Sequence, residues 1–181
     1  MFKIAMRMGG LSYYPYIGIA SLLRDDTLQR LRNGYAQVGL GVPTGIDLPG
    51  ETAGVIGVPD SAGKVLDITI GQFDTYTPMQ LAQYVSTIAN GGYRVQPRLL
   101  KEIRKPSQDG QMLGPLVEEI KPNILNRLDN TQEEIDRVRE GFRRVYYGAR
   151  GTARANFANT AYTAAGKTGT AEVVYFGPQK D

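Results

Sequence analysis

Histidine and cysteine are both absent from this chain of 181 residues. Without histidine the chain cannot form a Ser-His-Asp triad or use an imidazole as a general base. Without cysteine it has no thiol nucleophile, no disulfide and no thiolate ligand for zinc. Any acid–base chemistry must therefore use Lys, Asp, Glu, Tyr or a hydroxyl group.

A strong charge of one sign and a long hydrophobic run are also missing. The 21 Lys and Arg residues exceed the 18 Asp and Glu residues by only three, and they are scattered among acids, which favours solvated faces over a nucleic-acid-binding patch. The longest apolar stretch, residues 17–23, is too short to span a bilayer. Residues 1–14 do not resemble a signal peptide, because Arg7 and two glycines interrupt them. We expect a chain that is soluble as written.

Two helices are predicted, over residues 77–90 and 131–148. In each, a Thr N-cap is followed three residues later by Gln or Glu, which is a capping box, and glycine follows the last turn. Apolar residues recur at helical spacing in both. Weaker signals indicate helices over residues 2–8 and 26–36.

Short strands are expected over residues 65–70, 99–104 and 116–121, with a last strand over 163–175. Residues 39–60 are dense in Gly and Pro, which predicts an extended surface loop. Because helices and strands do not alternate regularly, we expect an α+β fold rather than a parallel βαβ series.

The strongest candidate for chemistry is residues 164–172, which read Ala-Ala-Gly-Lys-Thr-Gly-Thr-Ala-Glu. On a strand, Lys167 and Gly169 would lie on one face, and Thr168 and Thr170 on the other. Gly169 would allow a ligand's backbone to approach closely. A cation beside hydroxyls and a free backbone N–H suits a carboxylate or an oxyanion. From spacing alone, a glycine-kinked strand with a solvated lysine is an equal alternative.

The string Gly-Lys-Thr-Gly-Thr-Ala closely resembles that of class B penicillin-binding proteins, which are serine acyl-transferases that bind β-lactams. The other blocks of the resemblance follow the order of that family: Thr-Gly-Ile-Asp-Leu-Pro-Gly-Glu at 44–51, Ile-Gly-Gln at 70–72, Thr-Pro-Met-Gln-Leu-Ala at 77–82, Ile-Ala-Asn-Gly-Gly at 88–92 and Gly-Thr-Ala at 151–153. Phe73 departs from the pattern, since many members have a second glycine there.

The resemblance implies a transpeptidase domain like those of penicillin-binding proteins and serine β-lactamases, with an antiparallel sheet flanked by helices. A serine would attack a peptidoglycan stem peptide ending in D-Ala-D-Ala, expel the terminal D-Ala, and pass the acyl group to an amine of a neighbouring stem peptide. A lysine would be the general base, which suits a chain without histidine. No cofactor or metal is implied. The expected location is the extracytoplasmic face of the bacterial membrane, through an N-terminal anchor outside this chain.

The same resemblance assigns roles to four residues. Lys167 would shape the electrostatics around the nucleophile and the incoming carboxylate, and Thr168 and Thr170 would hydrogen-bond that carboxylate. The backbone N–H of Thr170 would form half of the oxyanion hole. Lys167 and Thr170 are thus the candidate catalytic residues, and Gly169 joins the three in the substrate-binding set. For Thr168, plain strand packing is the alternative.

The nucleophile is harder to find. Ser61-Ala62-Gly63-Lys64 is formally a Ser-x-x-Lys motif, but a working motif places its serine at a helix start, so that serine and lysine share one face. Because Gly63 lies within it and a predicted strand follows, we interpret it as a turn. It also follows residues 44–51, whereas the family's motif precedes them. No Ser-x-Asn occurs.

We therefore expect residues 1–181 to be a C-terminal fragment of a transpeptidase domain, incomplete at both ends and lacking the nucleophile. The isolated chain would be inactive, and its partners would be the remainder of its own domain, stem peptides and β-lactams. Two alternatives stay open. One is a non-catalytic module that binds peptidoglycan or β-lactams, and the other is a relative of serine β-lactamases.

Overall fold

The computed structural model describes residues 25–107, 110, 112–157, 160–169 and 177. The chain divides into two units, residues 1–135 and 136–181. The predicted helix over residues 2–8 lies outside the described residues. In the described part, no helix combines the length and the apolar character needed to cross a membrane.

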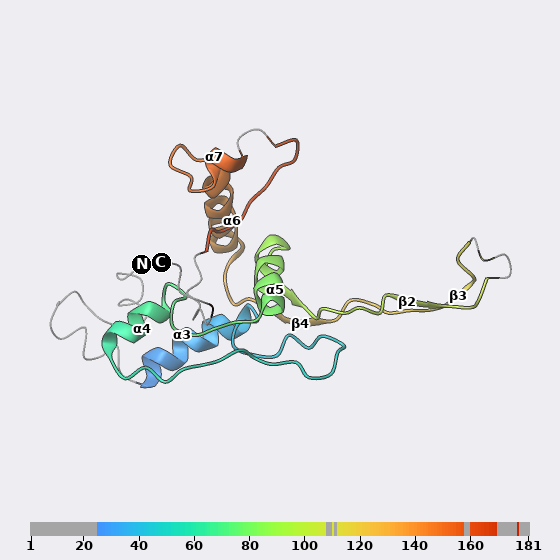
Figure 1. Ribbon diagram of the computed structural model, residues 1–181, viewed down its shortest axis with the longest axis horizontal. Helices are drawn as coiled ribbons and strands as arrows, with labels where there is room; N and C mark the ends of the chain where they lie inside the picture. The colour runs from blue at the N-terminus through green and yellow to red at the C-terminus, as the bar shows by residue number, and fades with distance from the viewer. Residues whose placement is uncertain (1–24, 108–109, 111, 158–159, 170–176, 178–181) are drawn as a thin grey trace. The chain divides into compact units, whose positions relative to one another are not determined.

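The helices and strands, labelled in Figure 1, are α3 Asp25–Gln37, α4 Ala62–Ile68, α5 Pro78–Ala89, β1 Tyr93–Val95, β2 Glu102–Arg104, β3 Leu116–Glu119, β4 Ile124–Arg127, α6 Gln132–Tyr147 and α7 Arg154–Phe157. The expected α+β class is confirmed.

Side-chain caps fix the start of α5 as predicted. The Thr77 hydroxyl accepts the Gln80 backbone N–H at 3.2 Å, and the Gln80 side chain accepts the Thr77 N–H at 2.9 Å. The helix stops at Asn90, and the glycine that follows at 92 has a φ of 96°. A Cβ on Gly92 would lie 2.7 Å from the side chain of Ile135. The positive φ is therefore the main reason for glycine at this stop, and a side chain here would also force the end of the Ile135 side chain to shift.

The other two predicted helices are also confirmed. Helix α6 begins after Thr131, whose N–H donates to the Glu134 carboxylate at 2.9 Å, while the Glu134 N–H donates to the Thr131 hydroxyl at 3.3 Å. This reciprocal pair is the predicted capping box. Helix α3 extends one residue beyond the prediction at each end.

The strand predicted over residues 65–70 is wrong, because Ala62–Ile68 is the helix α4. The side chain of Ser61 caps its first turn by accepting the Lys64 backbone N–H. Val65 and Ile68 are each 1% exposed, whereas Asp67 between them is exposed. A buried spacing of three residues belongs to a helix, and β-branched residues in a short apolar run hid it. Val65 packs with Leu31 of α3 in the core of the first unit.

The strands form a two-stranded antiparallel ribbon in two parts (Figure 1). Strand β1 pairs with β4 and packs against α5, and β2 pairs with β3. Two predicted strands are confirmed with shorter limits: β2 is the last half of the strand predicted over residues 99–104, and β3 is the first four residues of the strand predicted over 116–121. The sequence pattern missed β1 and β4, because they are only three and four residues long and carry few buried side chains.

Residues 39–60 form the predicted loop, with no helix or regular strand. Helix α5 holds this loop through buried amide side chains. Gln80, fully buried, donates to the carbonyl oxygens of Val42 at 2.8 Å and Ala53 at 3.1 Å. Because these bonds satisfy backbone groups that no sheet satisfies, they fix both arms of the loop on one helix.

Gln83 joins the loop to the ribbon. Its amide nitrogen donates to the carbonyl oxygens of Thr44 at 3.1 Å and Val95 at 3.0 Å. Its amide oxygen accepts the Nε–H of Arg94 at 3.0 Å, and Arg94 also donates to Pro43 O at 2.6 Å. Burial lowers the pKa of Arg94, and the charge of Glu51 opposes this shift.

Candidate functional site

The segment predicted to carry chemistry lies in the second unit, beside α6 and the turn that follows this helix. The expected strand over residues 163–175 is wrong for its described half: residues 163–169 belong to no strand, and residues 170–175 lie outside the described residues. No strand of the described part pairs with this segment. Its backbone bonds to α6 instead, with the Gly166 N–H on Phe142 O at 3.2 Å and the Ala164 N–H on the Tyr147 hydroxyl at 3.0 Å.

Every second residue of the segment contacts the helical part of the unit. Ala164 and Gly166 do so through their N–H groups, and Thr168 does so through its side chain. Gly166 is buried, and a Cβ there would lie 3.2 Å from the hydroxyl of Tyr146. The Tyr146 ring packs edge-on against Phe157 of α7, with 4.8 Å between centroids. Alternate residues of the segment, Ala164, Gly166 and Thr168, therefore contact α6 and the turn that follows it rather than a neighbouring strand.

The outward residues of the segment are open to solvent. Lys167 is exposed, and its ammonium donates to Thr168 O at 2.8 Å. Gly169 is exposed, and no described atom lies within 4 Å of the place a Cβ would take. The Thr168 hydroxyl lies 3.2 Å from that of Thr152. The structure thus leaves Lys167, Thr168 and Gly169 exposed in one continuous stretch, the Lys167–Gly169 edge, while Thr170 lies outside the described residues.

The sequence prediction gave no role to the four residues that contact this segment, which are Phe142, Tyr146, Tyr147 and Thr152. Thr152 belongs to the Gly-Thr-Ala block at 151–153, so a signal was present, but the motif alone names no partner for it. The two tyrosines are the last residues of α6 and gave no signal beyond a helical apolar face.

The second unit is strongly basic. Its sequence, residues 136–181, contains eight Lys and Arg against four acids, a net charge of +4, while the whole chain has +3. Hydrogen bonds and charges from Arg143 and Arg144 lower the pKa of Glu140 to about 2. An excess of cations attracts anionic ligands to the surface that carries them. The basic residues that the structure describes in this unit are all exposed, and they are Arg137, Arg139, Arg143, Arg144, Arg150, Arg154 and Lys167.

Ser61 requires a correction, since it begins a helix rather than a turn. Its hydroxyl accepts the Lys64 backbone N–H at 3.5 Å, but the Lys64 ammonium pairs with Asp60 at 2.8 Å. The hydrogen bond and charge of Lys64 lower the pKa of Asp60. A lysine acts as a base on serine only within hydrogen-bond distance of its hydroxyl. Here the carboxylate holds the ammonium instead, so Ser61 and Lys64 do not form an assembled nucleophile.

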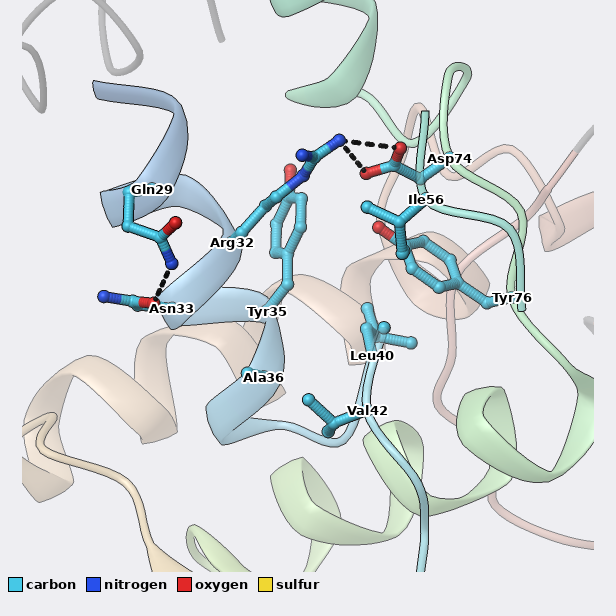
Figure 2. A pocket seen from close by; sticks show the side chains of 11 residues that line it. Gln29, Arg32, Asn33, Tyr35, Ala36, Leu40, Val42, Ile56, Asp74 and Tyr76 are labelled. Atoms are coloured by element: carbon cyan, nitrogen blue, oxygen red, sulfur yellow. Dashed lines mark hydrogen bonds and ion pairs between the residues drawn. The ribbon is translucent and has the colours of Figure 1, made fainter. Parts of the chain in front are cut away.

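The first unit contains a cavity of about 210 Å³ between α3 and the segments that follow it (Figure 2). Figure 2 shows the Arg32 guanidinium pointing at Asp74, to which it is paired at 3.2 Å. Burial raises the pKa values of Tyr35 and Tyr76, and the negative charge of Asp74 raises them further. Paired charges and protonated phenols supply neither a nucleophile nor a base at neutral pH. Among the described residues, no cluster of three acidic side chains is suited to a metal ion.

A family model for the penicillin binding protein transpeptidase domain matches residues 10–181, and the chain belongs to this family. The resemblance found in the sequence is thereby confirmed.

Penicillin-binding protein H of Bacillus subtilis (strain 168) is 45% identical over 182 residues, which cover 100% of this chain and 25% of that protein. The solved structure of penicillin-binding protein 2B from Streptococcus pneumoniae (strain 5204) matches with a TM-score of 0.82 and 34% identity, over 91% of this chain and 27% of that one. A more distant relative, peptidoglycan D,D-transpeptidase MrdA of Haemophilus influenzae, is 32% identical over 157 residues, 81% of this chain and 23% of that protein. The chain spans about a quarter of the length of these curated relatives.

Proposed function

We propose that this chain is part of a serine D,D-transpeptidase that crosslinks peptidoglycan stem peptides and binds β-lactams covalently by the same route. The observation that carries the proposal is the Lys167–Gly169 edge: an exposed cation, a hydroxyl and an open glycine, held on a unit with an excess of positive charge. Membership of the transpeptidase family supports it, as does the relative named as a D,D-transpeptidase.

In the proposed reaction, a serine oxygen attacks the penultimate D-Ala carbonyl of a stem peptide ending in D-Ala-D-Ala. The amide C–N bond breaks, and the serine proton passes through a lysine base to the leaving D-Ala amine. An amine of a second stem peptide then attacks the ester, a new amide forms, and the serine regains its proton. Peptidoglycan crosslinking of this kind takes place outside the membrane, and we propose that location, with a membrane anchor elsewhere in the protein.

Within that reaction, this chain supplies the groups that bind the carboxylate. Lys167 provides the positive charge, and Thr168 donates a hydrogen bond to the terminal carboxylate of the peptide or of a β-lactam. Thr170 is proposed to donate a second bond through its hydroxyl and to stabilise the oxyanion through its N–H. Gly169 leaves room for the ligand's backbone.

We propose that the nucleophile and its lysine base come from the remainder of the transpeptidase domain. The pairing of Lys64 with Asp60 supports this, since it leaves Ser61 without a base. Residues 1–181 alone would then bind carboxylates without forming an acyl-enzyme. A module that only binds peptidoglycan is the second possibility, and the labelling experiment separates the two.

The test is labelling with a fluorescent penicillin, followed on a denaturing gel. The native protein with its whole natural chain, residues 1–181 alone, and the native protein carrying Ser61→Ala are compared. We expect equal labelling of the native protein and the Ser61→Ala variant, and none of residues 1–181. An unlabelled native protein would contradict the acyl-transfer proposal and favour a binding module. Loss of label in Ser61→Ala would make Ser61 the nucleophile.

A further inference from the structure

Thr168 has a hydrogen-bonding partner within its own unit. Its Oγ1 lies 3.2 Å from Oγ1 of Thr152, sixteen residues earlier in the chain. Both side chains are exposed, so a ligand in solution can reach the pair. The contact is therefore polar and accessible, and it differs from the plain packing that is the alternative role for Thr168.

The turn that carries Thr152 is fixed on the end of α6. The Gly151 N–H donates to Gly148 O at 2.8 Å, and the N–H of the buried Ala153 donates to Val145 O at 3.0 Å. A Cβ on Gly151 would lie 2.5 Å from Val145 O, so only glycine allows the turn to approach the helix this closely. Thr152 is β-branched and stiff at χ1. Its hydroxyl is thus presented to Thr168 from a well-defined position.

The direction of the hydrogen bond between the two hydroxyls follows from what each group can donate. A threonine hydroxyl has one proton and two acceptor lone pairs, whereas a carboxylate can only accept. If Thr168 donated to Thr152, its proton would be committed and a carboxylate would meet only its lone pairs. With a carboxylate bound, Thr168 must donate to the ligand, which leaves its oxygen free to accept from Thr152.

We propose that Thr152 is a positioning residue, which donates its proton to Thr168 Oγ1 and so directs the Thr168 proton toward the carboxylate of the substrate. This inference rests on the proposed function of the Lys167–Gly169 edge. Two hydrogen bonds in series polarise one another, so the bond to the carboxylate is stronger with Thr152 in place. The bond is worth most when the ligand carries a full negative charge.

The experiment measures the second-order rate constant of acylation of the native protein, with its whole natural chain, by benzylpenicillin and by benzylpenicillin methyl ester. Thr152→Val keeps the shape of the side chain and removes the hydroxyl, and Thr152→Ser keeps the hydroxyl. We expect the valine variant to react with benzylpenicillin roughly 3- to 10-fold more slowly, the usual worth of one hydrogen bond. The serine variant should restore the rate, and the ester, which lacks the carboxylate, should show less than about a twofold effect.

The role of Thr152 would be overturned if the valine variant and the unsubstituted protein reacted with benzylpenicillin at equal rates. It would also be overturned if the valine variant lost as much rate with the methyl ester as with benzylpenicillin. In both cases the proposed acyl transfer would still stand. An unsubstituted protein that takes no acyl group would refute the proposed function instead. The role of Thr152 is then decided by titrating ¹⁵N-labelled protein with N-acetyl-D-alanyl-D-alanine and following the Thr168 signals. Weaker binding in Thr152→Val that Thr152→Ser restores supports the role, and equal binding in all three proteins overturns it.

Discussion

Replacing Gln83 with leucine should destabilise the first unit more than any exposed substitution on the same helix. The Gln83 side chain is 4% exposed and makes three hydrogen bonds. It donates to the carbonyl oxygens of Thr44 and Val95 and accepts from Arg94. Leucine is of similar size but satisfies none of these groups, so two buried carbonyls and a guanidinium N–H would lose their partner.

The size of the effect follows from those three groups. A buried polar group left without its partner costs about 1–3 kcal/mol, and the bond to the charged Arg94 lies toward the upper end. The apolar surface of leucine recovers about 1 kcal/mol. We therefore expect the free energy of unfolding to fall by about 4 kcal/mol, which corresponds to a drop in Tm of roughly 10 °C for a chain of this size.

The assay is urea unfolding followed by circular dichroism at 222 nm, with the exposed Ser86 of the same helix as the control. Ser86→Ala should change the free energy of unfolding by less than about 0.5 kcal/mol. A loss below about 1 kcal/mol in Gln83→Leu, or one equal to that of Ser86→Ala, would refute the view that Gln83 joins loop, helix and ribbon.

Two further predictions concern pH and backbone crowding. Burial alone would raise the pKa of Glu51, but hydrogen bonds from Thr44 and Gly45 hold it below its ordinary value of 4.5. This stabilisation is present above pH 4.5 and is lost as the pH falls through the lowered pKa of Glu51. Between pH 7 and pH 3, the Tm of Glu51→Gln should therefore fall less steeply than that of the unsubstituted protein. Parallel plots of Tm against pH for the two proteins would contradict this. Gly151→Ala should lower Tm, because the added Cβ would lie 2.5 Å from a backbone carbonyl oxygen of α6. Gly141→Ala should instead raise Tm by a few degrees, because Gly141 lies in mid-helix with open space around it and alanine is the better helix former. Equal shifts in the two glycine variants would refute the crowding at Gly151.

Sequence reasoning predicted the helices whose ends are fixed locally. The capping boxes at Thr77 and Thr131 each involve residues three apart, so the sequence contains both partners in one short window. Helix α4 was misassigned because Val65 and Ile68 lie in a short β-branched run, in which buried spacings of two and three are hard to tell apart.

Contacts between distant residues could not be predicted in the same way. Gln83 and Thr44 are 39 residues apart, and Arg94 and Pro43 are 51 apart, so no local pattern indicates that they bond. In the candidate site, the motif indicated Lys167 and its neighbours but not the residues that hold them in place. Those residues lie in α6 and in the turn that follows it, and their contacts with the segment are tertiary.

The central claim is that the Lys167–Gly169 edge binds the carboxylate of the acyl donor. It is tested most directly by the rate at which the native protein is acylated by a fluorescent penicillin when Lys167 is replaced by glutamine. The exposed Lys121 of the first unit, replaced in the same way, is the control. Loss of a charge-assisted contact predicts a rate roughly 10- to 100-fold lower for Lys167→Gln and no change for Lys121→Gln. Equal rates for both variants and the unsubstituted protein would contradict the claim.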